Sequence, residues 1–117
     1  MSTDDPNRYF TLRVYSVALD AVRRLRPTLE TVARKDPDLG RQLRKATTSF
    51  HLNIADGMNA NGRIKVARYD TALGSANEVL ACLDCADALG YAKVDPIARD
   101  RVHHVRATLI NLKRSRR

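Results

Sequence analysis

The feature that most restricts the fold is a helical spacing of apolar residues that recurs in four segments of the chain. In each segment these residues follow one another at intervals of three and four, which places them on one face of a helix. Two Asp-Pro pairs, at 36–37 and 95–96, mark helix starts, because Asp is a favoured N-cap and Pro a favoured first helical residue. The Asn- and Gly-rich residues 58–62 predict a further turn. The pattern therefore predicts an all-α chain.

We expect one helix from about residue 8, a second over 37–57, a third over 63–89 with Gly90 as its C′ residue, and a fourth from residue 96. Four helices joined by short turns predict an antiparallel up-down-up-down four-helix bundle. A chain of 117 residues suffices for one core, so a single domain spans residues 1–117. Its ends, residues 1–7 and 113–117, are expected to be frayed.

The first helix carries two apolar stripes. One consists of Leu12, Tyr15, Leu19, Val22, Leu29 and Ala33, and an adjacent one of Val14, Ala18, Ala21, Leu25 and Val32. A helix that is apolar over so much of its circumference needs neighbours on two sides. Pro27 lies inside this pattern and predicts a kink near residues 23–27, with a break into two helices as the alternative.

An amide stands on the apolar seam of the second helix. The seam consists of Leu43, Ala46, Phe50, Asn53 and Gly57. A buried amide without partners costs roughly 1–3 kcal/mol, so Asn53 needs a partner on another helix, and we expect a polar contact with Glu78 that sets the register of the bundle. The alternative, which the sequence leaves open, is that Asn53 contacts a ligand.

The third helix is rich in small residues. Its seam of Tyr69, Ala72, Ala76, Val79, Leu83 and Ala86 is accompanied by Ser75 and Cys82. Small side chains let another backbone come close, and together with the wide apolar face of the first helix they exceed what one bundle needs. This surplus predicts a homo-oligomer.

The chain is strongly basic. It has 21 Lys and Arg against 13 Asp and Glu, a net charge of +8, which favours a polyanionic partner, most commonly nucleic acid. A charge that only aids solubility is the alternative. Aromatic residues are few, with four Tyr, two Phe and no Trp, so any nucleic-acid binding should be directed at phosphates.

The candidate nucleic-acid-binding residues gather at both ends of the expected bundle. One end holds Arg23, Arg24, Arg26, Arg34, Lys35, Arg41, Arg44 and Lys45. The other holds Arg63, Lys65, Arg68, Lys113, Arg114, Arg116 and Arg117, with Arg8 and Arg13 nearby. The sequence does not distinguish the two ends.

Catalytic, metal and cofactor sites are not expected. Cys82 and Cys85 form a CxxC within one helix, but a closed zinc site needs four ligands, and His103 is the candidate that packing would bring nearest. Free thiols are the default interpretation, in keeping with a reducing cytoplasm. The chain has no apolar run long enough to span a membrane.

Three motifs carry a family resemblance: SFHLNIADG at 49–57, ALGSANE at 72–78 and ALGY at 88–91. They resemble the patterns S-x-x-x-N-I-A-E-G, A-x-G-S-x-x-E and L-G-Y of a bacterial four-helix-bundle family. That family includes proteins encoded in intervening sequences of large-subunit ribosomal RNA genes, and it is related to accessory variability proteins of diversity-generating retroelements. The resemblance covers about residues 9–112, with Asp56 in place of the usual Glu and His51 where Pro is common. Its motif positions here are Asn53, Asp56, Gly57, Gly74, Ser75 and Glu78.

The resemblance implies a homopentameric ring with a basic surface and no known enzymatic activity. Accessory proteins of the retroelement branch bind nucleic acid and a reverse transcriptase. Two functions are therefore expected: a non-enzymatic RNA-binding or DNA-binding accessory protein or, alternatively, a structural scaffold that grips a protein partner.

Overall fold

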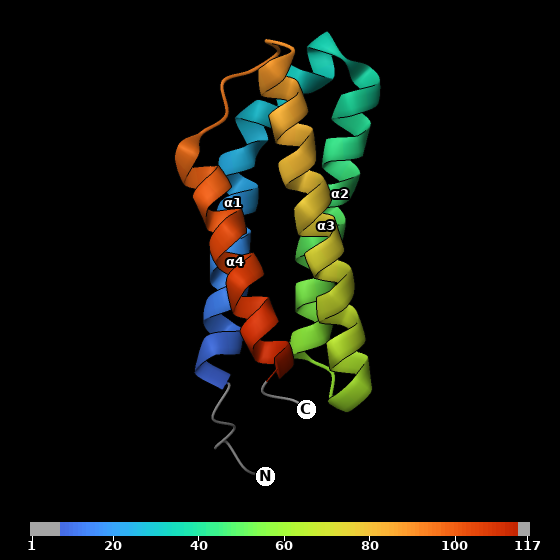
Figure 1. Cartoon of the computed structure of the whole chain (residues 1–117), viewed down its shortest axis with the longest axis vertical. Helices are drawn as coiled ribbons and strands as arrows, with labels where there is room; N and C mark the ends of the chain where they lie inside the picture. Colours follow the sequence, from blue (N-terminus) through green and yellow to red (C-terminus); the bar gives the residue numbers. More distant parts are fainter. Residues whose placement is uncertain (1–7, 115–117) are drawn as a thin grey trace.

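The protein is a bundle of four helices. The structure, a computed structural model, describes residues 8–114, with side chains from 11 to 113. Within this range it contains α1 (Arg8–Lys35), α2 (Pro37–Met58), α3 (Gly62–Ala88) and α4 (Pro96–Arg114), and no strand. The helices alternate in direction along an axis 50 Å long, with a cross-section of 22 by 20 Å (Figure 1). The predicted all-α antiparallel four-helix bundle is confirmed.

The helix ends follow the local signals in the sequence. The Asp36 carboxylate caps α2 by accepting a hydrogen bond from the backbone N–H of Leu39 at 3.0 Å. The carboxylate of Asp95 likewise accepts one from the N–H of Ile97 at 2.9 Å, at the start of α4. After α3, Gly90 adopts φ +73°, the left-handed conformation that ends many helices.

The first helix continues through Pro27, as expected, because α1 is one helix there, and the alternative of a break into two helices is excluded. Residues 113 and 114, which were expected to be frayed, belong to α4. Fraying predicted for residues 1–7 and 115–117 lies outside the described residues, and the kink near residues 23–27 stays a prediction.

The two apolar stripes of α1 have different surroundings. The stripe that begins at Val14 enters the core, and all five of its residues are at most 1% exposed. The stripe that begins at Leu12 lies at the edge of the bundle beside α2, where Tyr15 packs on His51 with ring centroids 5.2 Å apart. Leu12 itself is 45% exposed. The stripe that begins at Val14 is therefore part of the core, and the stripe that begins at Leu12 is mostly half-buried at its edge.

The pair α2 and α3 shares the most extensive interface of the bundle. Gly57 allows this closeness, because a Cβ atom at this position would lie 2.5 Å from Cε1 of the buried Tyr69 ring. Gly40 has the same role against α1, where a Cβ atom would lie 2.6 Å from the Cα atom of Ala33. Both glycines are required by close approach between helices.

A ladder of polar contacts joins α3 to α4. Its rungs are the ion pairs Arg99–Asp84 and Lys113–Asp70 and, between them, a hydrogen bond of 2.8 Å from Arg106 Nε to Asn77 Oδ1. Successive rungs are seven residues apart on both helices, in opposite directions. Seven residues are close to two helical turns, so only one antiparallel register makes all three contacts together.

The Gly57 contact predicts a specific coupling with Tyr69. Gly57→Ala should destabilise the fold by about 1–3 kcal/mol, because the added methyl group overpacks the ring. In a Tyr69→Ala background, which removes the ring, the same substitution should cost much less. Urea unfolding of the four proteins in this double-mutant cycle measures the coupling, and equal costs in both backgrounds would contradict the steric explanation.

The ladder predicts the effect of a charge at its middle rung. Asn77→Asp would turn the hydrogen bond with Arg106 into a third ion pair, worth roughly 0.2–1 kcal/mol for an exposed site. We expect a small gain in the free energy of unfolding at low salt that disappears at about 1 M salt, where charges are screened. Asn77→Ala, the control, should destabilise at both salt concentrations. A gain for Asn77→Asp that persisted at high salt would contradict an electrostatic origin.

Candidate nucleic-acid interface

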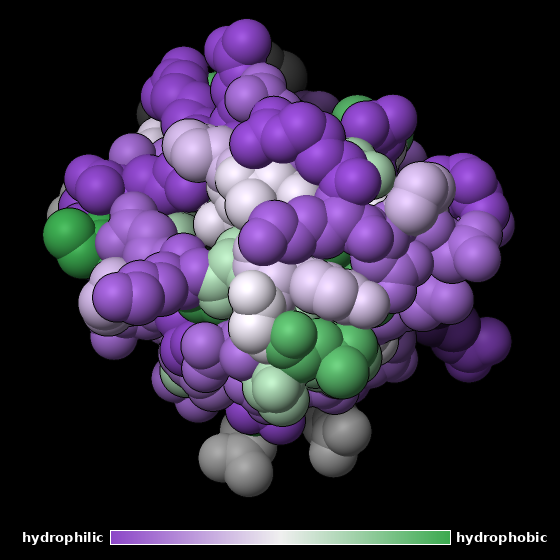
Figure 2. All heavy atoms as spheres, turned by 90° about the horizontal axis from the view of Figure 1, so that it is seen from above, coloured by the Kyte–Doolittle hydropathy of each residue, from purple (hydrophilic) through white to green (hydrophobic). Residues whose placement is uncertain are grey.

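Positive charge is concentrated near the turn between α1 and α2. Residues 23–45 contain eight basic and three acidic residues, against thirteen and ten in the rest of the chain. Because α1 ends at Lys35 and α2 begins at Pro37, these residues occupy the same half of the bundle. Figure 2 looks onto this end and shows hydrophilic side chains over most of it.

The Tyr15–His51 contact identifies which side of each helix faces the other. Arg26 follows Tyr15 by eleven residues, about three helical turns, and Arg44 precedes His51 by seven, about two turns. Both arginines therefore flank the α1–α2 seam. The surface formed around them, here named the cationic α1–α2 surface, consists of Arg23, Arg26, Arg34, Lys35, Arg41, Arg44 and Lys45, all exposed.

Most of these cations have no carboxylate beside them. Arg26 pairs with Glu30 at 3.1 Å and Arg41 with Asp38, both within one helix and both exposed. Exposed pairs of this kind contribute little free energy and rearrange readily. The other five have no carboxylate within 4.0 Å among the described side chains.

Shallow hollows on α2 bring several of these groups together. One, of about 500 Å³, is lined by Arg41, Arg44, Lys45, Thr48 and Ser49. Another, of about 400 Å³, shares Arg41 and Lys45 with it. The lining of the first hollow is almost entirely apolar, so the aliphatic stems of these side chains form its walls, and their charged ends remain available around it.

Three of the sequence-predicted cations have structural partners instead. Arg24 faces α4 and contacts Asp20 at 2.9 Å and Asp95 at 4.0 Å. Lys65 is only 4% exposed, and Lys113 forms a rung of the α3–α4 ladder. Arg63 and Arg68 stay exposed at the opposite end of the bundle. The side chains of Arg114, Arg116 and Arg117 lie outside the described residues.

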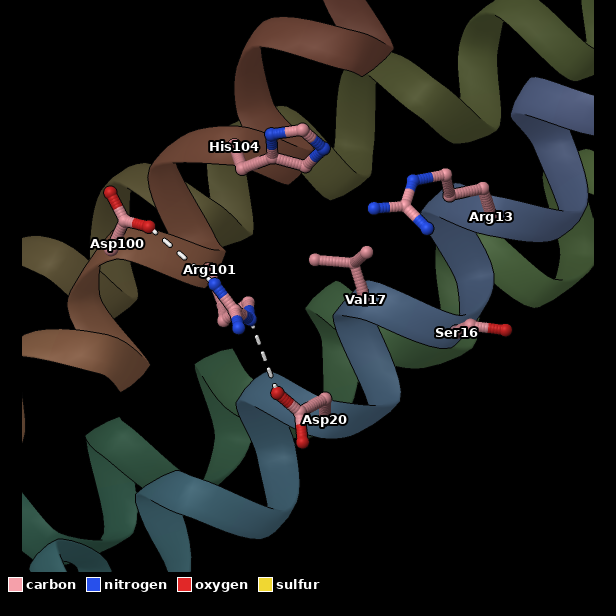
Figure 3. Close-up of a pocket in the computed structure, with 7 residues that line it drawn as sticks. All are labelled: Arg13, Ser16, Val17, Asp20, Asp100, Arg101 and His104. Carbon is pink, nitrogen blue, oxygen red and sulfur yellow. Dashed lines mark hydrogen bonds and ion pairs between the residues drawn. The ribbon is translucent and has the colours of Figure 1, made fainter.

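A groove of about 400 Å³ separates α1 from α4 (Figure 3). It is lined by Arg13, Ser16, Val17, Asp20, Asp100, Arg101 and His104. Asp20 accepts hydrogen bonds from Arg24 and, at 3.2 Å, from Nε of Arg101, and Arg101 also lies 3.6 Å from Asp100. The hydrogen bond from Arg24 is the main cause that lowers the pKa of Asp20. Opposite charges are paired across the groove, so it acts as a clamp between α1 and α4 and offers little net attraction for an anion.

The sequence indicated only part of this clamp. Asp20 and Arg24 are four residues apart, a spacing that favours an ion pair on one helix. Arg101 lies 81 residues from Asp20, so its participation follows only from the packing of α4 against α1.

The motif residues form a polar link between α2 and α3, but with other partners than predicted. The hydroxyl of Ser75 donates to that of Ser49 at 2.7 Å, and Asn53 Nδ2 donates to the Ser49 carbonyl at 2.9 Å. Asn53 is half-buried at the edge of the seam, and Glu78 is exposed. The predicted Asn53–Glu78 contact is therefore wrong among the described residues. Asn53 is satisfied one turn back, and a solvated Glu78 avoids the cost of burying a charge.

The remaining motif positions have separate surroundings. Asp56 and Gly74 are exposed, and a Cβ atom at Gly74 would meet no atom within 4 Å. Tyr91, from the ALGY motif, is half-buried, and burial followed by the nearby Asp36 carboxylate raises its pKa. This tyrosine therefore connects the α3–α4 turn to the α1–α2 turn.

The two cysteines differ in burial. Cys82 is buried, which is the main cause that raises the pKa of its thiol, and Cys85 is exposed. Within residues 11–113, no three His, Cys, Asp or Glu side chains converge as metal ligands would. Across the described helices, none has the length and apolar character needed to cross a membrane.

Comparison with known proteins agrees with the fold and with the family resemblance. The model of the 23S rRNA-intervening sequence protein family matches residues 11–110. No curated protein matches the chain. A solved structure from Bacteroides thetaiotaomicron, described as a protein with unknown function from the S23 ribosomal protein family, superposes with a TM-score of 0.78 at 17% identity and covers 89% of this chain and 97% of its own. The structural likeness shows the same fold, and because the family model spans most of the sequence, this chain belongs to the 23S rRNA-intervening sequence protein family.

Proposed function

We propose that this protein is a non-enzymatic RNA-binding accessory protein that holds phosphates on the cationic α1–α2 surface. The observation that carries the proposal is the group of five exposed cations without a carboxylate within 4.0 Å among the described side chains: Arg23, Arg34, Lys35, Arg44 and Lys45. When such cations neutralise phosphates, the nucleic acid releases its condensed counterions, and this release is a main driving force of binding to phosphates. The description of the family, which refers to 23S rRNA, makes RNA the favoured polyanion.

The cations at the opposite end of the bundle also favour the cationic α1–α2 surface as the RNA-binding site, because two of them are buried or paired. At the opposite end Lys65 is buried and Lys113 contacts Asp70, which leaves Arg63 and Arg68 as its exposed cations with described side chains on α3. Each charge that is already paired has less to gain from a phosphate. We therefore place the RNA on α1 and α2 and treat the Arg63–Arg68 end as the comparison surface.

Two matched variants test this choice. Arg34→Gln with Arg44→Gln should lower RNA affinity and reduce the slope of log K against log salt by about 1.8, because each lost phosphate contact removes about 0.9. Arg63→Gln with Arg68→Gln removes the same charge and should change the slope much less. Fluorescence anisotropy over a salt series gives both slopes, and circular dichroism checks that both variants remain helical. A larger loss for the Arg63–Arg68 variant would contradict the assignment, and salt-independent binding would contradict the function.

An outward-facing stripe on α3 supports assembly of several copies. Seven exposed residues follow one another at spacings of four and three. Six of them are small or short, Ala67, Thr71, Gly74, Ala81, Cys85 and Ala88, and Glu78 occupies the middle position of the series. We propose that this stripe contacts a second copy in a homo-oligomer, a pentamer by the family resemblance. Several copies of the cationic α1–α2 surface in one particle would then bind a long polyanion with increased avidity. The same stripe would serve the alternative function, a scaffold for a protein partner such as a reverse transcriptase.

Light scattering tests the assembly. The protein at micromolar concentration should be larger than the 13.1 kDa of one chain. Gly74→Leu, which meets no atom of its own chain within 4 Å, should reduce the mass, because it blocks close helix contact. Ala107→Leu, a change at another exposed position, on α4, is the control and should leave the mass unchanged. A stable monomer in the unmodified protein would contradict the oligomer.

A further inference from the structure

We infer that the RNA recognised by this protein is double-helical, an inference that rests on the proposed function and names its substrate class. Two features of the structure carry it. Among the side chains from 11 to 113, the aromatic rings that single-stranded RNA would need are occupied by contacts of the fold, and the cations of the binding surface stand in two rows on neighbouring helices.

Proteins that bind single strands stack bases on exposed aromatic rings. Among the side chains from 11 to 113 there are four such rings. Phe50 and Tyr69 are at most 1% exposed, Tyr15 is half-buried against His51, and Tyr91 is half-buried beside the α1–α2 turn. Each ring is occupied by contacts of the fold. Over the described surface, recognition must therefore use the phosphate backbone, which a duplex presents on its outside.

The two rows of cations follow α1 and α2. On α1 the row consists of Arg23, Arg26 and Arg34, and on α2 of Arg41, Arg44 and Lys45. Eleven residues separate Arg23 from Arg34, which is about 16 Å along a helix. Packed helices lie about 8–10 Å apart, so the rows run side by side at a nearly fixed separation.

A rigid double row matches two strands better than one. A duplex presents a phosphate row on each side of its wide, shallow minor groove, and both rows are held in place by base pairing. A single strand offers one flexible row and loses conformational freedom when it is fixed on a helix face. Each phosphate contact steepens the fall of log K with log salt by about 0.9. If a contact contributes little at about 1 M salt, it therefore raises the affinity roughly tenfold at about 0.1 M salt. The double row should therefore select the duplex.

The test compares three RNA probes with the full chain. They are an A-form duplex of roughly 20 base pairs, which exceeds the roughly 16 base pairs that duplex-binding domains span, and each of its two strands alone, chosen without self-complementarity. Fluorescence anisotropy at one salt concentration gives the three dissociation constants. We expect the duplex to bind at least about tenfold more tightly than either strand.

Two variants test whether the two rows of cations cause the preference for duplex RNA over single strands. Arg23→Gln, Arg26→Gln and Arg34→Gln together remove the α1 row and should bring the duplex-to-strand ratio close to one. Arg13→Gln, Arg63→Gln and Arg68→Gln remove three exposed cations from the opposite end of the bundle and should keep the ratio, although overall affinity falls. Circular dichroism checks that both variants fold.

The outcomes separate this inference from the proposed function. Equal binding of duplex and strands, or tighter binding of a strand, overturns the inference and leaves RNA binding intact. A duplex preference that survives loss of the α1 row also overturns it, because the two rows would not be its cause. Binding of none of the probes overturns the proposed function together with the inference.

Discussion

The close contact of α2 with α3 is the constraint on which the rest of the bundle depends. Gly57 admits the Tyr69 ring, and the Ser49–Ser75 hydrogen bond joins the same two helices further along. From this pair the structure extends in both directions. Gly40 brings α2 against Ala33 of α1, and the α3 side of the ladder from Asp70 to Asp84 holds α4. Of the family motif, Gly57 and Ser75 thus act at the contact between α2 and α3, whereas Asp56, Gly74 and Glu78 are exposed.

The way each pair of helices is held together explains which surface cations have no carboxylate partner. Cations on α4 are largely used to hold α4 in place, through the ladder with α3 and the clamp with Asp20 of α1. The contact of α1 with α2 instead depends on apolar packing and on Tyr15–His51, so the arginines beside it need no partner for folding. Surface charge that folding does not require is available to a polyanion. The cationic α1–α2 surface therefore follows from the way each pair of helices is held together.

Local features were predictable from the sequence and long-range pairings were not. The N-cap Asp36, the C′ residue Gly90 and the start of α2 depend on neighbouring residues, and all agree with the structure. The partners of Asn53, Arg24 and Lys113 depend on how helices are rotated about their axes. The orientation of α3 about its axis places Glu78 in solvent and Ser75 against Ser49. The apolar spacing alone does not determine this orientation to within part of a turn. Of the candidate site, the sequence identified the basic residues, and the structure distinguished those already paired from those that are free.

The most direct test of the account is a residue-by-residue map of RNA contact on the isotope-labelled protein by NMR. Titration with duplex RNA should shift the signals of exposed residues between 23 and 45, and those of Thr48 beside the hollow on α2, while Asp84 and Arg106 in the ladder stay unchanged. Shifts confined to Arg63, Arg68 and the neighbouring end of the bundle would contradict the central claim, because the RNA would then lie on the comparison surface and not on α1 and α2.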